Sequence, residues 1–175
     1  MDKRLVEPFA VVAQTLKSLP SPGLLLASLD ANGRPNAMTI GWGSVGVFWS
    51  RPMFVVPVRE SRYTHGCIAA TGDFTVHVLP ADLAEVAAYC GSVSGRDHDK
   101  FAERGLAWTP GRHVRSPIIA QCLISYECRV VHHNELAPGV LDAAIKQSFY
   151  GSPDYHTFYF GEILAARGTE EYGSS

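Results

Sequence analysis

The sequence has no strong excess of charge of either sign. Its 15 basic and 17 acidic residues leave a formal net charge of -2, with a pI near 6.4. A surface that follows nucleic-acid phosphates is usually basic, so this balance argues against nucleic acid as a partner. We therefore expect the partners to be small molecules or other proteins.

Long hydrophobic runs are also missing. The apolar stretch near the start is broken by Glu7, Gln14 and Lys17, so neither a signal-peptide core nor a membrane span can be drawn there. Cysteine is scarce, and the four cysteines contain no C-x-x-C pair, which predicts buried thiols rather than a disulfide framework. We expect a soluble, cytoplasmic protein with no membrane partner.

Several familiar catalytic signatures are absent. There is no G-x-S-x-G elbow, no G-x-x-x-x-G-K-[ST] loop and no Rossmann glycine fingerprint, which argues against simple hydrolases and P-loop NTPases. No metal site is predicted, because the His65-x-Cys67 and His132-His133 pairs lack a four-ligand pattern. The D-x-D at 97–99 lacks the glycine and glutamate of a calcium loop. Because the Rossmann fingerprint is missing, any nicotinamide nucleotide would dock only transiently.

A chain of 175 residues, 46% of them apolar, can bury one sizeable core but is too short for two ordinary domains. We expect a single domain over residues 1–175, with a core of about 22–165 and a helical insertion of about 135–154. Turn residues separate many short β-branched and aromatic runs. Strands are predicted at 24–29, after Pro35, and at 45–49, 53–58, 74–79, 118–131 and 157–165.

Helices are predicted in four places. Phe9, Val12, Ala13 and Leu16 are spaced as the apolar face of a helix that ends before Pro20. Residues 63–70 form a second helix closed by Gly72, and Asp82 is the expected N-cap of a third. A fourth helix is expected after Pro138. Many strands with few helices favour a mainly β fold, a small barrel with helices around it.

Three segments carry hydrogen-bond donors and small residues suited to a phosphorylated, planar ligand. In the first, residues 36–42 (NAMTIGW), strand alternation sends Asn36, Met38 and Trp42 to one face. The amide can meet a heterocycle edge and the indole offers a flat surface. The alternative is that the asparagine caps a turn and the tryptophan fills the core.

The second segment, residues 59–64 (RESRYT), follows a strand and opens a helix. It offers two hydroxyls, two arginines and backbone N–H groups, which suit a phosphate monoester. Ordinary capping by Ser61 beside solvated arginines is the alternative. The third segment, residues 94–101 (SGRDHDKF), lets the backbone approach a ligand closely. In it, Lys100 is expected in the first turn of a short helix, where it reaches the phosphate or the ring edge.

Together the three segments resemble, in order and spacing, the flavin reductase-like FMN-binding split-barrel family, in particular its flavoredoxin branch. The resemblance covers about 22–165. It implies that Asn36, Trp42, Thr64 and Lys100 contact FMN. The same motifs imply nine neighbouring residues: Ala37, Met38, Thr39, Arg59, Ser61, Arg62, Ser94, Gly95 and Arg96. The segment HTFYFGE at 156–162 resembles the family's closing strand, which makes His156 a further candidate. A strand-end histidine satisfied by backbone is the alternative there.

The resemblance also implies a homodimer and flavin redox chemistry, with hydride passing from NADH or NADPH to the flavin N5. No catalytic acid or base is predicted, because the flavin itself performs the chemistry. An NAD(P)H-dependent flavin or ferric reductase is the leading function. The alternatives are an electron carrier that keeps its FMN and meets a redox protein partner, and a non-catalytic barrel for flavin storage or ligand sensing.

Overall fold

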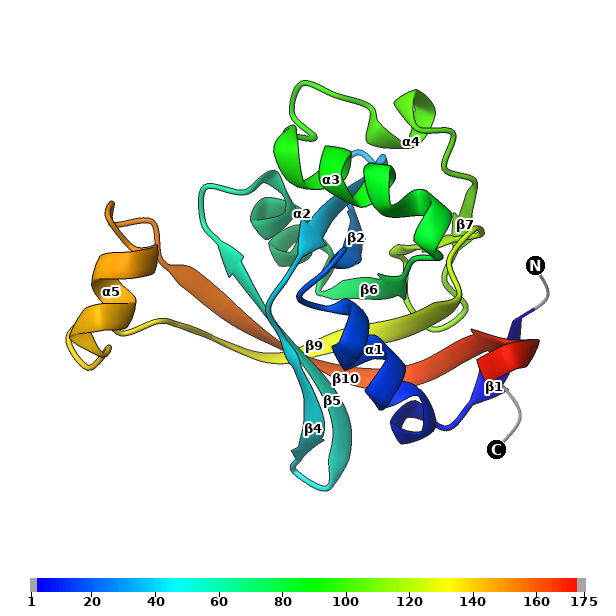
Figure 1. The fold of residues 1–175 in the computed structure, drawn as a ribbon, viewed down its shortest axis with the longest axis horizontal. Coiled ribbons are helices and arrows are strands. Elements are labelled where there is room, and N and C mark those ends of the chain that lie inside the picture. The colour runs from blue at the N-terminus through cyan, green and yellow to red at the C-terminus, as the bar shows by residue number, and fades with distance from the viewer. Residues whose placement is uncertain (1–2, 173–175) are drawn as a thin grey trace.

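The computed structural model describes residues 3–172, so the outermost positions of the predicted 1–175 domain lie outside the described residues. Eight strands form one curved sheet: seven lie in the order β3-β2-β6-β9-β10-β5-β4, and β1 pairs with the far end of β10 (Figure 1). The strands of this sheet are β1 Lys3–Val6, β2 Leu24–Leu29, β3 Pro35–Ile40, β4 Ser44–Phe48, β5 Arg51–Arg59, β6 Asp73–Val78, β9 Ile124–Glu135 and β10 His156–Thr169. A separate two-stranded sheet joins β7 Trp108–Pro110 to β8 Pro117–Ile119.

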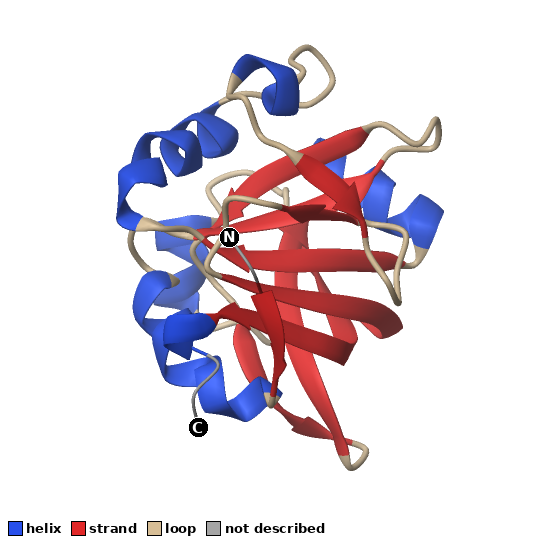
Figure 2. Cartoon of the chain, turned by 90° about the vertical axis from the view of Figure 1, so that its right-hand side faces the viewer, coloured by secondary structure: helices blue, strands red, loops and turns tan. Residues whose placement is uncertain are grey.

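The helices flank the strands, most of them along one side (Figure 2). None within residues 3–172 has both the length and the apolar character needed to cross a bilayer. The α-helices are α1 Val12–Ser18, α2 Tyr63–Thr71, α3 Ala84–Ser92, α4 Lys100–Glu103 and α5 Ala143–Phe149. Short 3-10 turns lie at η1 Pro8–Val11, η2 Ala81–Leu83 and η3 Glu170–Tyr172.

Interactions between neighbouring residues form the turns of two hairpins, one on each side of the first motif in the sequence. In the β2–β3 turn, Asp30 Oδ1 accepts hydrogen bonds from the backbone nitrogens of Asn32 and Arg34, and Gly33 takes a left-handed conformation with φ of 80°. In the β4–β5 turn, Trp49 and Ser50 both have positive φ, as the tight hairpin twist requires. The strands predicted on either side of these two turns are confirmed, and each pair is antiparallel.

Two apolar clusters lie on opposite faces of the strands. The larger one, inside the curved sheet, joins side chains of β2, β5, β6, β9 and β10, including Phe54, Phe74 and Tyr126. The smaller one lies beneath α3 and α4 and includes Leu25, Ala37 and Phe101. Side chains of β2 and β3 therefore alternate between the clusters, as the period of a strand requires. All four cysteines are buried free thiols, as predicted.

The predicted apolar face of the first helix is wrong. Phe9 and Leu16 are exposed, whereas Val11, Thr15 and Leu19 are buried. The segment starts as the tighter 3-10 turn η1, which shifts the helical phase. Thr15 can be buried because its hydroxyl hydrogen-bonds the hydroxyl of Tyr126 at 2.6 Å, a long-range partner that periodicity does not reveal.

Three other predictions need correction. Asp82 lies inside the turn η2 and does not cap the following helix, whose N-cap position is Leu83. The strand expected at 118–131 is interrupted, because β8 pairs with β7 while β9 starts at Ile124 in the large sheet. The alternating sequence of β6 predicts a half-buried strand, but β6 is buried along its whole length. Phe74, Val76 and Val78 join the larger apolar cluster. On the other face, the segment around β8 covers the strand, where Thr75 Oγ1 donates to the Pro117 backbone oxygen and the His77 ring accepts from the Ile119 backbone nitrogen.

The insertion projects from the ends of β9 and β10 (Figure 1). Its helix α5 is shorter than the stretch expected after Pro138, and Val140 is 88% exposed. Asp142 caps the helix by accepting hydrogen bonds from the backbone nitrogens of Ala144 and Ile145. The C-terminal end of α5 leads back to the start of β10, which places the insertion beside the predicted site.

Candidate functional site

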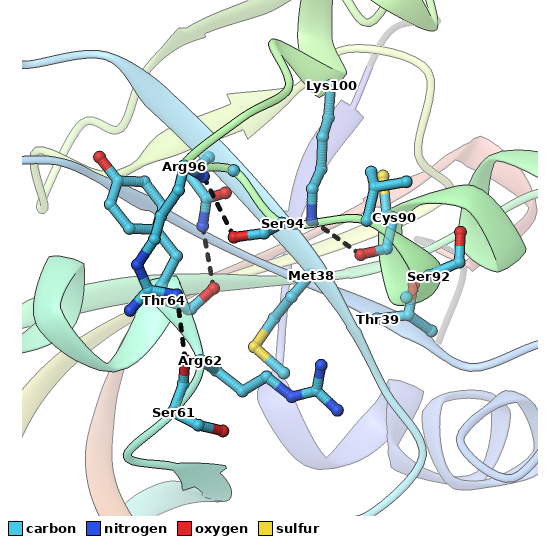
Figure 3. Close-up of a pocket in the computed structure, with 15 residues that line it drawn as sticks. Met38, Thr39, Ser61, Arg62, Thr64, Cys90, Ser92, Ser94, Arg96 and Lys100 are labelled. Atoms are coloured by element: carbon cyan, nitrogen blue, oxygen red, sulfur yellow. Dashed lines mark hydrogen bonds between the residues drawn. The ribbon is translucent and has the colours of Figure 1, made fainter.

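Two adjoining cavities, of about 220 and 250 Å³, share Met38, Thr39 and Arg62 in their walls. Figure 3 shows the first, where β3, the start of α2 and the loop before α4 converge. Of the predicted site residues, Ala37 alone lines neither cavity. The first is lined by Asn36, Met38, Thr39, Ser61, Arg62, Thr64, Ser94, Gly95, Arg96 and Lys100, and the second by Met38, Thr39, Trp42, Arg59, Arg62 and His156.

A buried hydrogen bond joins the first two motifs. Asn36 Nδ2 donates to Thr64 Oγ1 at 2.9 Å, and both side chains are almost fully buried. The other amide atom, Asn36 Oδ1, has no hydrogen-bond partner within residues 3–172. A buried polar atom without a partner costs free energy, so a donor from a bound molecule would stabilise this position. The alternative role of Asn36 as a turn cap is wrong.

The third motif closes over the first two. A Cβ at Gly95 would collide with the Asn36 side chain and with the Tyr63 ring, so only glycine allows this approach. Arg96 Nη1 donates to the backbone oxygen of Ser61 at 3.0 Å, and its guanidinium lies over the Tyr63 ring. The Ser94 hydroxyl accepts from the Arg96 backbone nitrogen at 3.2 Å. The loop is thereby held against the N-terminus of α2.

Lys100 differs from its predicted geometry. It is in the first turn of a short helix, as expected, and Asp99 caps that helix. Its ammonium, however, is buried and donates to the backbone oxygens of Ala37 and Cys90, both at 2.8 Å (Figure 3). Burial lowers the pKa of Lys100. The side chain therefore ties β3 to α3 at the cavity wall, and Ala37 acts through its carbonyl.

Arg62 is a positively charged residue of the site whose side chain is available to a ligand. Its guanidinium lines both cavities and has no ion pair or side-chain hydrogen bond among the described residues. No aspartate or glutamate of the described chain lines either cavity. A cleft with arginine, hydroxyl and backbone donors and no carboxylate matches the needs of a phosphate monoester. The donor set therefore fits the FMN phosphate.

The second cavity has aromatic walls. Trp42 is 43% exposed, so the alternative that it fills the core is wrong. Its indole lies 5.1 Å from the ring centre of Phe149 and 5.2 Å from that of His156. Flat side chains around an opening of this kind suit a planar heterocycle. Trp42 comes from the first motif, Phe149 from the end of α5 in the insertion, and His156 from the start of β10.

His156 is held as a neutral base. Its Nδ1 hydrogen-bonds the hydroxyl of Tyr150 at 2.7 Å, so the predicted alternative of a ring satisfied by backbone is wrong. Burial, followed by the charge of Arg59, lowers the pKa of His156 to about 4. The imidazole is therefore uncharged near neutral pH and keeps its remaining nitrogen for the cavity.

Arg59 and Ser61 bind residues of the insertion. Arg59 donates to the backbone oxygen of Phe149 at 2.8 Å and lies 3.8 Å from the carboxylate of Asp154. The Ser61 hydroxyl donates to the same carboxylate at 2.7 Å, and it does not cap α2. The charge of Arg59 is therefore already paired, whereas Arg62, the other arginine of the second segment, has no ion pair among the described residues.

Several lining residues escaped the sequence analysis. Tyr63 stands inside the second motif, but its aromatic ring gave no phosphate signal. Phe149 lies in the insertion, where no pattern connects it to Trp42. Within residues 3–172 no group of three or more His, Cys, Asp or Glu is arranged to hold a metal ion. The remaining lining residues that were not predicted are Ile40, Gly41, Pro57, Cys90, Gly91, Ser92 and Val93.

Comparisons with known proteins give the family and the fold. A family profile described as flavin reductase like domain matches residues 16–174. The solved flavoredoxin of Desulfovibrio vulgaris (Miyazaki F) superposes with a TM-score of 0.70 at 28% identity, covering 87% of this chain and 72% of that one. Flavoredoxin from Methanosarcina acetivorans gives a TM-score of 0.68 at 32% identity, covering 86% of this chain and 70% of that one.

A curated relative from Archaeoglobus fulgidus is 30% identical over 131 residues, which is 75% of this chain. The match spans 64% of that relative, slightly less than two thirds of its length. The predicted fold class, a mainly β split barrel of the flavin reductase-like type, is confirmed by the sheet and by these structural matches.

Proposed function

Because the chain belongs to the flavin reductase like domain family, we propose that it binds FMN in the two adjoining cavities and works as an NAD(P)H-dependent flavin or ferric reductase. The observation that carries the proposal is the convergence of three distant motifs on one carboxylate-free cleft. Bound FMN would accept a hydride at N5 and pass electrons on singly or in pairs. The protein supplies binding, orientation and exclusion of water.

The phosphate and ribityl chain fit the first cavity. Arg62 provides the free charge, while Ser94 and Thr64 add hydroxyls at its wall. Lys100 supports this end indirectly by fixing β3 against α3 through two carbonyls. Charge-assisted hydrogen bonds from a guanidinium are among the strongest contacts for phosphate. This end would therefore contribute most of the preference for FMN over unphosphorylated riboflavin.

The ring system fits the second cavity. Asn36 lines the first cavity, on the strand whose Met38 and Thr39 line both cavities. Its unpaired oxygen would accept from an N–H donor of a flavin ring that extends from the second cavity towards the first. Trp42 and Phe149 flank the opening, and neutral His156 closes one side. Phe149 and the tether of Asp154 to Ser61 bring the insertion to this opening. The insertion would thus limit which acceptors reach the ring.

We also propose a homodimer. Apolar side chains at the β4–β5 hairpin, in η1 and on α1 remain exposed, among them Val47 at 62%, Trp49 at 61%, Phe9 of η1 at 43% and Leu16 of α1 at 40%. The hairpin tip and α1 lie on the same side of the sheet in Figure 1. Exposed apolar surface of this kind marks a protein interface. Light scattering of the purified protein would test this, with a monomer mass at micromolar concentration as the contrary result.

An electron carrier is the second candidate, favoured by the similarity to two proteins named flavoredoxin. A visible spectrum of the purified protein tests cofactor binding, with a stoichiometric flavin chromophore as the expected result. Anaerobic addition of NADH or NADPH then separates the functions. Rapid bleaching supports the reductase, whereas bleaching only with a reduced protein donor supports the carrier. If neither donor bleaches the flavin, flavin storage or ligand sensing would be the remaining function, and the proposed reductase activity would be contradicted.

A further inference from the structure

A third cavity, of about 270 Å³, lies far from the flavin site. It is bounded by β1, the β7–β8 sheet and strands β9 and β10, and shares no lining residue with the first two cavities. Arg167, in its wall, lies near the end of β10, whereas His156 of the flavin site stands at the start of the same strand. The cavity is therefore a separate feature that the flavin chemistry does not use.

A buried carboxylate with one unpaired oxygen lies in its wall. Glu127 is 1% exposed, and its Oε2 accepts a hydrogen bond from the backbone nitrogen of His113 at 2.7 Å. Its Oε1 has no hydrogen-bond partner in the described chain, and the nearest cation, Arg167 Nε, is 3.8 Å away. That separation is too long for a hydrogen bond. A buried carboxylate oxygen in this state favours a donor from outside the chain.

The loop around this carboxylate is tightly built. A Cβ at Gly111 would lie 2.6 Å from the Val114 backbone oxygen and 2.9 Å from Glu127 Oε2. Only glycine therefore allows the 111–114 turn to close on the carboxylate. The position of Oε1 is fixed by the strand on one side and by this turn on the other. This oxygen is the one nearer to Arg167, another residue of the cavity wall.

Positive charge exceeds negative charge in the cavity. Lys3, Arg112 and Arg167 face the single carboxylate of Glu127. The Lys3 ammonium donates to the Ile119 backbone oxygen at 2.9 Å and to the Ser125 hydroxyl at 3.4 Å, which leaves one of its three protons for a ligand. Arg112 is exposed and has no ion pair within residues 3–172. Three cations against one carboxylate leave an excess of two positive charges, even though Arg167 lies 3.8 Å from Glu127, and this excess suits a ligand with an acidic group.

We propose that this cavity binds a small carboxylic acid that also carries an ammonium or hydroxyl donor. The acid group would pair with Arg112 and Arg167, and the donor would complete the hydrogen bonding of Glu127 Oε1. A cavity below the usual size for drug-like ligands limits the ligand to a few carbon atoms. The proposal does not depend on the flavin site, because no residue is shared.

Calorimetry on the protein as purified tests the proposal with three acids of equal length: L-aspartate, L-malate and succinate. We expect the first two to bind and succinate, which lacks the donor, to bind about tenfold more weakly. Arg112→Ala should weaken aspartate and malate about tenfold, since it removes one charge-assisted contact. Arg51→Ala is the matched control, because this exposed arginine lies on the β4–β5 hairpin outside the cavity.

Glu127→Gln gives a second, independent arm. It preserves the side-chain shape but puts an amide where the free carboxylate oxygen stands, so the advantage of malate over succinate should disappear. Flavin absorbance and thermal melting of each variant show separately whether the protein is folded. Equal affinity for succinate and malate, unchanged binding in Arg112→Ala, or no heat from any acid at millimolar concentration would overturn the proposal.

Discussion

The Asn36 side-chain nitrogen donates a buried hydrogen bond of 2.9 Å to Thr64 Oγ1, and in doing so joins two motifs that are 28 residues apart in the sequence. The bond orients the amide so that its oxygen is the atom left without a partner. The Gly95 loop closes over the same amide. All three motifs therefore meet at Asn36, and its orientation depends on Thr64.

Replacing Thr64 by valine tests this relationship. The change keeps the shape of the side chain but leaves the buried Asn36 nitrogen without an acceptor, which should cost about 1 to 3 kcal/mol of unfolding free energy. The amide would also lose its fixed orientation, so the FMN dissociation constant should rise. Urea denaturation and flavin fluorescence titration measure the two effects. Retention of wild-type FMN affinity would show that the amide does not recognise the flavin.

Removal of the Arg62 charge should weaken the binding of the flavin phosphate and leave the binding of the ring unchanged. In Arg62→Gln we expect FMN to bind about 10 to 100 times more weakly, because charge-assisted contacts to phosphate are lost. Riboflavin, which has no phosphate, should bind with unchanged affinity. Parallel titrations with both flavins measure this, and Arg51→Gln on the distant hairpin is the control. An equal loss for both flavins would contradict placement of the phosphate beside Arg62.

The insertion can be tested through Phe149. This side chain is 49% exposed, so Phe149→Ala should change the unfolding free energy by less than about 1 kcal/mol. Loss of the ring that meets Trp42 should change the KM for the acceptor while FMN affinity stays nearly constant. Ile145→Ala is the matched control, since it lies on the same helix, is 46% exposed and lines neither site cavity. The same KM shift in both variants would exclude a specific role for Phe149.

His156 should make stability depend on pH. Its pKa is lowered from 6.5 to about 4 in the fold, chiefly by burial. Between these values the unfolded chain binds a proton that the folded chain does not, so stability falls as the pH falls from 6.5 towards 4. His77, with a pKa lowered to about 3 by burial and by Lys3, acts in the same direction.

Urea unfolding at several pH values measures this slope. His156→Asn keeps a polar partner for the Tyr150 hydroxyl but does not titrate, so its slope should be shallower than that of the wild type. The contribution of His77 is common to both proteins and cancels in the comparison. Identical slopes would show that His156 does not keep a lowered pKa in the folded state.

Some features followed from the sequence because short-range chemistry decides them. The Asp30 to Gly33 turn and the left-handed Gly72 cap are made by residues next to one another in the chain. The buried face of the first helix could not be predicted in this way. Its exposed Phe9 and buried Thr15 reverse what side-chain polarity predicts, because Tyr126, more than a hundred residues away, supplies the hydrogen bond.

By itself the sequence determined most strands of the large sheet, several turns and the chemical character of the three motifs, since alternation, glycine placement and donor content are local properties. Only the tertiary structure decided the use of each side chain. Lys100 serves two carbonyls, Arg59 holds the insertion, and Glu127 keeps one oxygen free. These roles depend on which charges and hydrogen-bond groups folding brings together, and that pairing is written in no single segment of the chain.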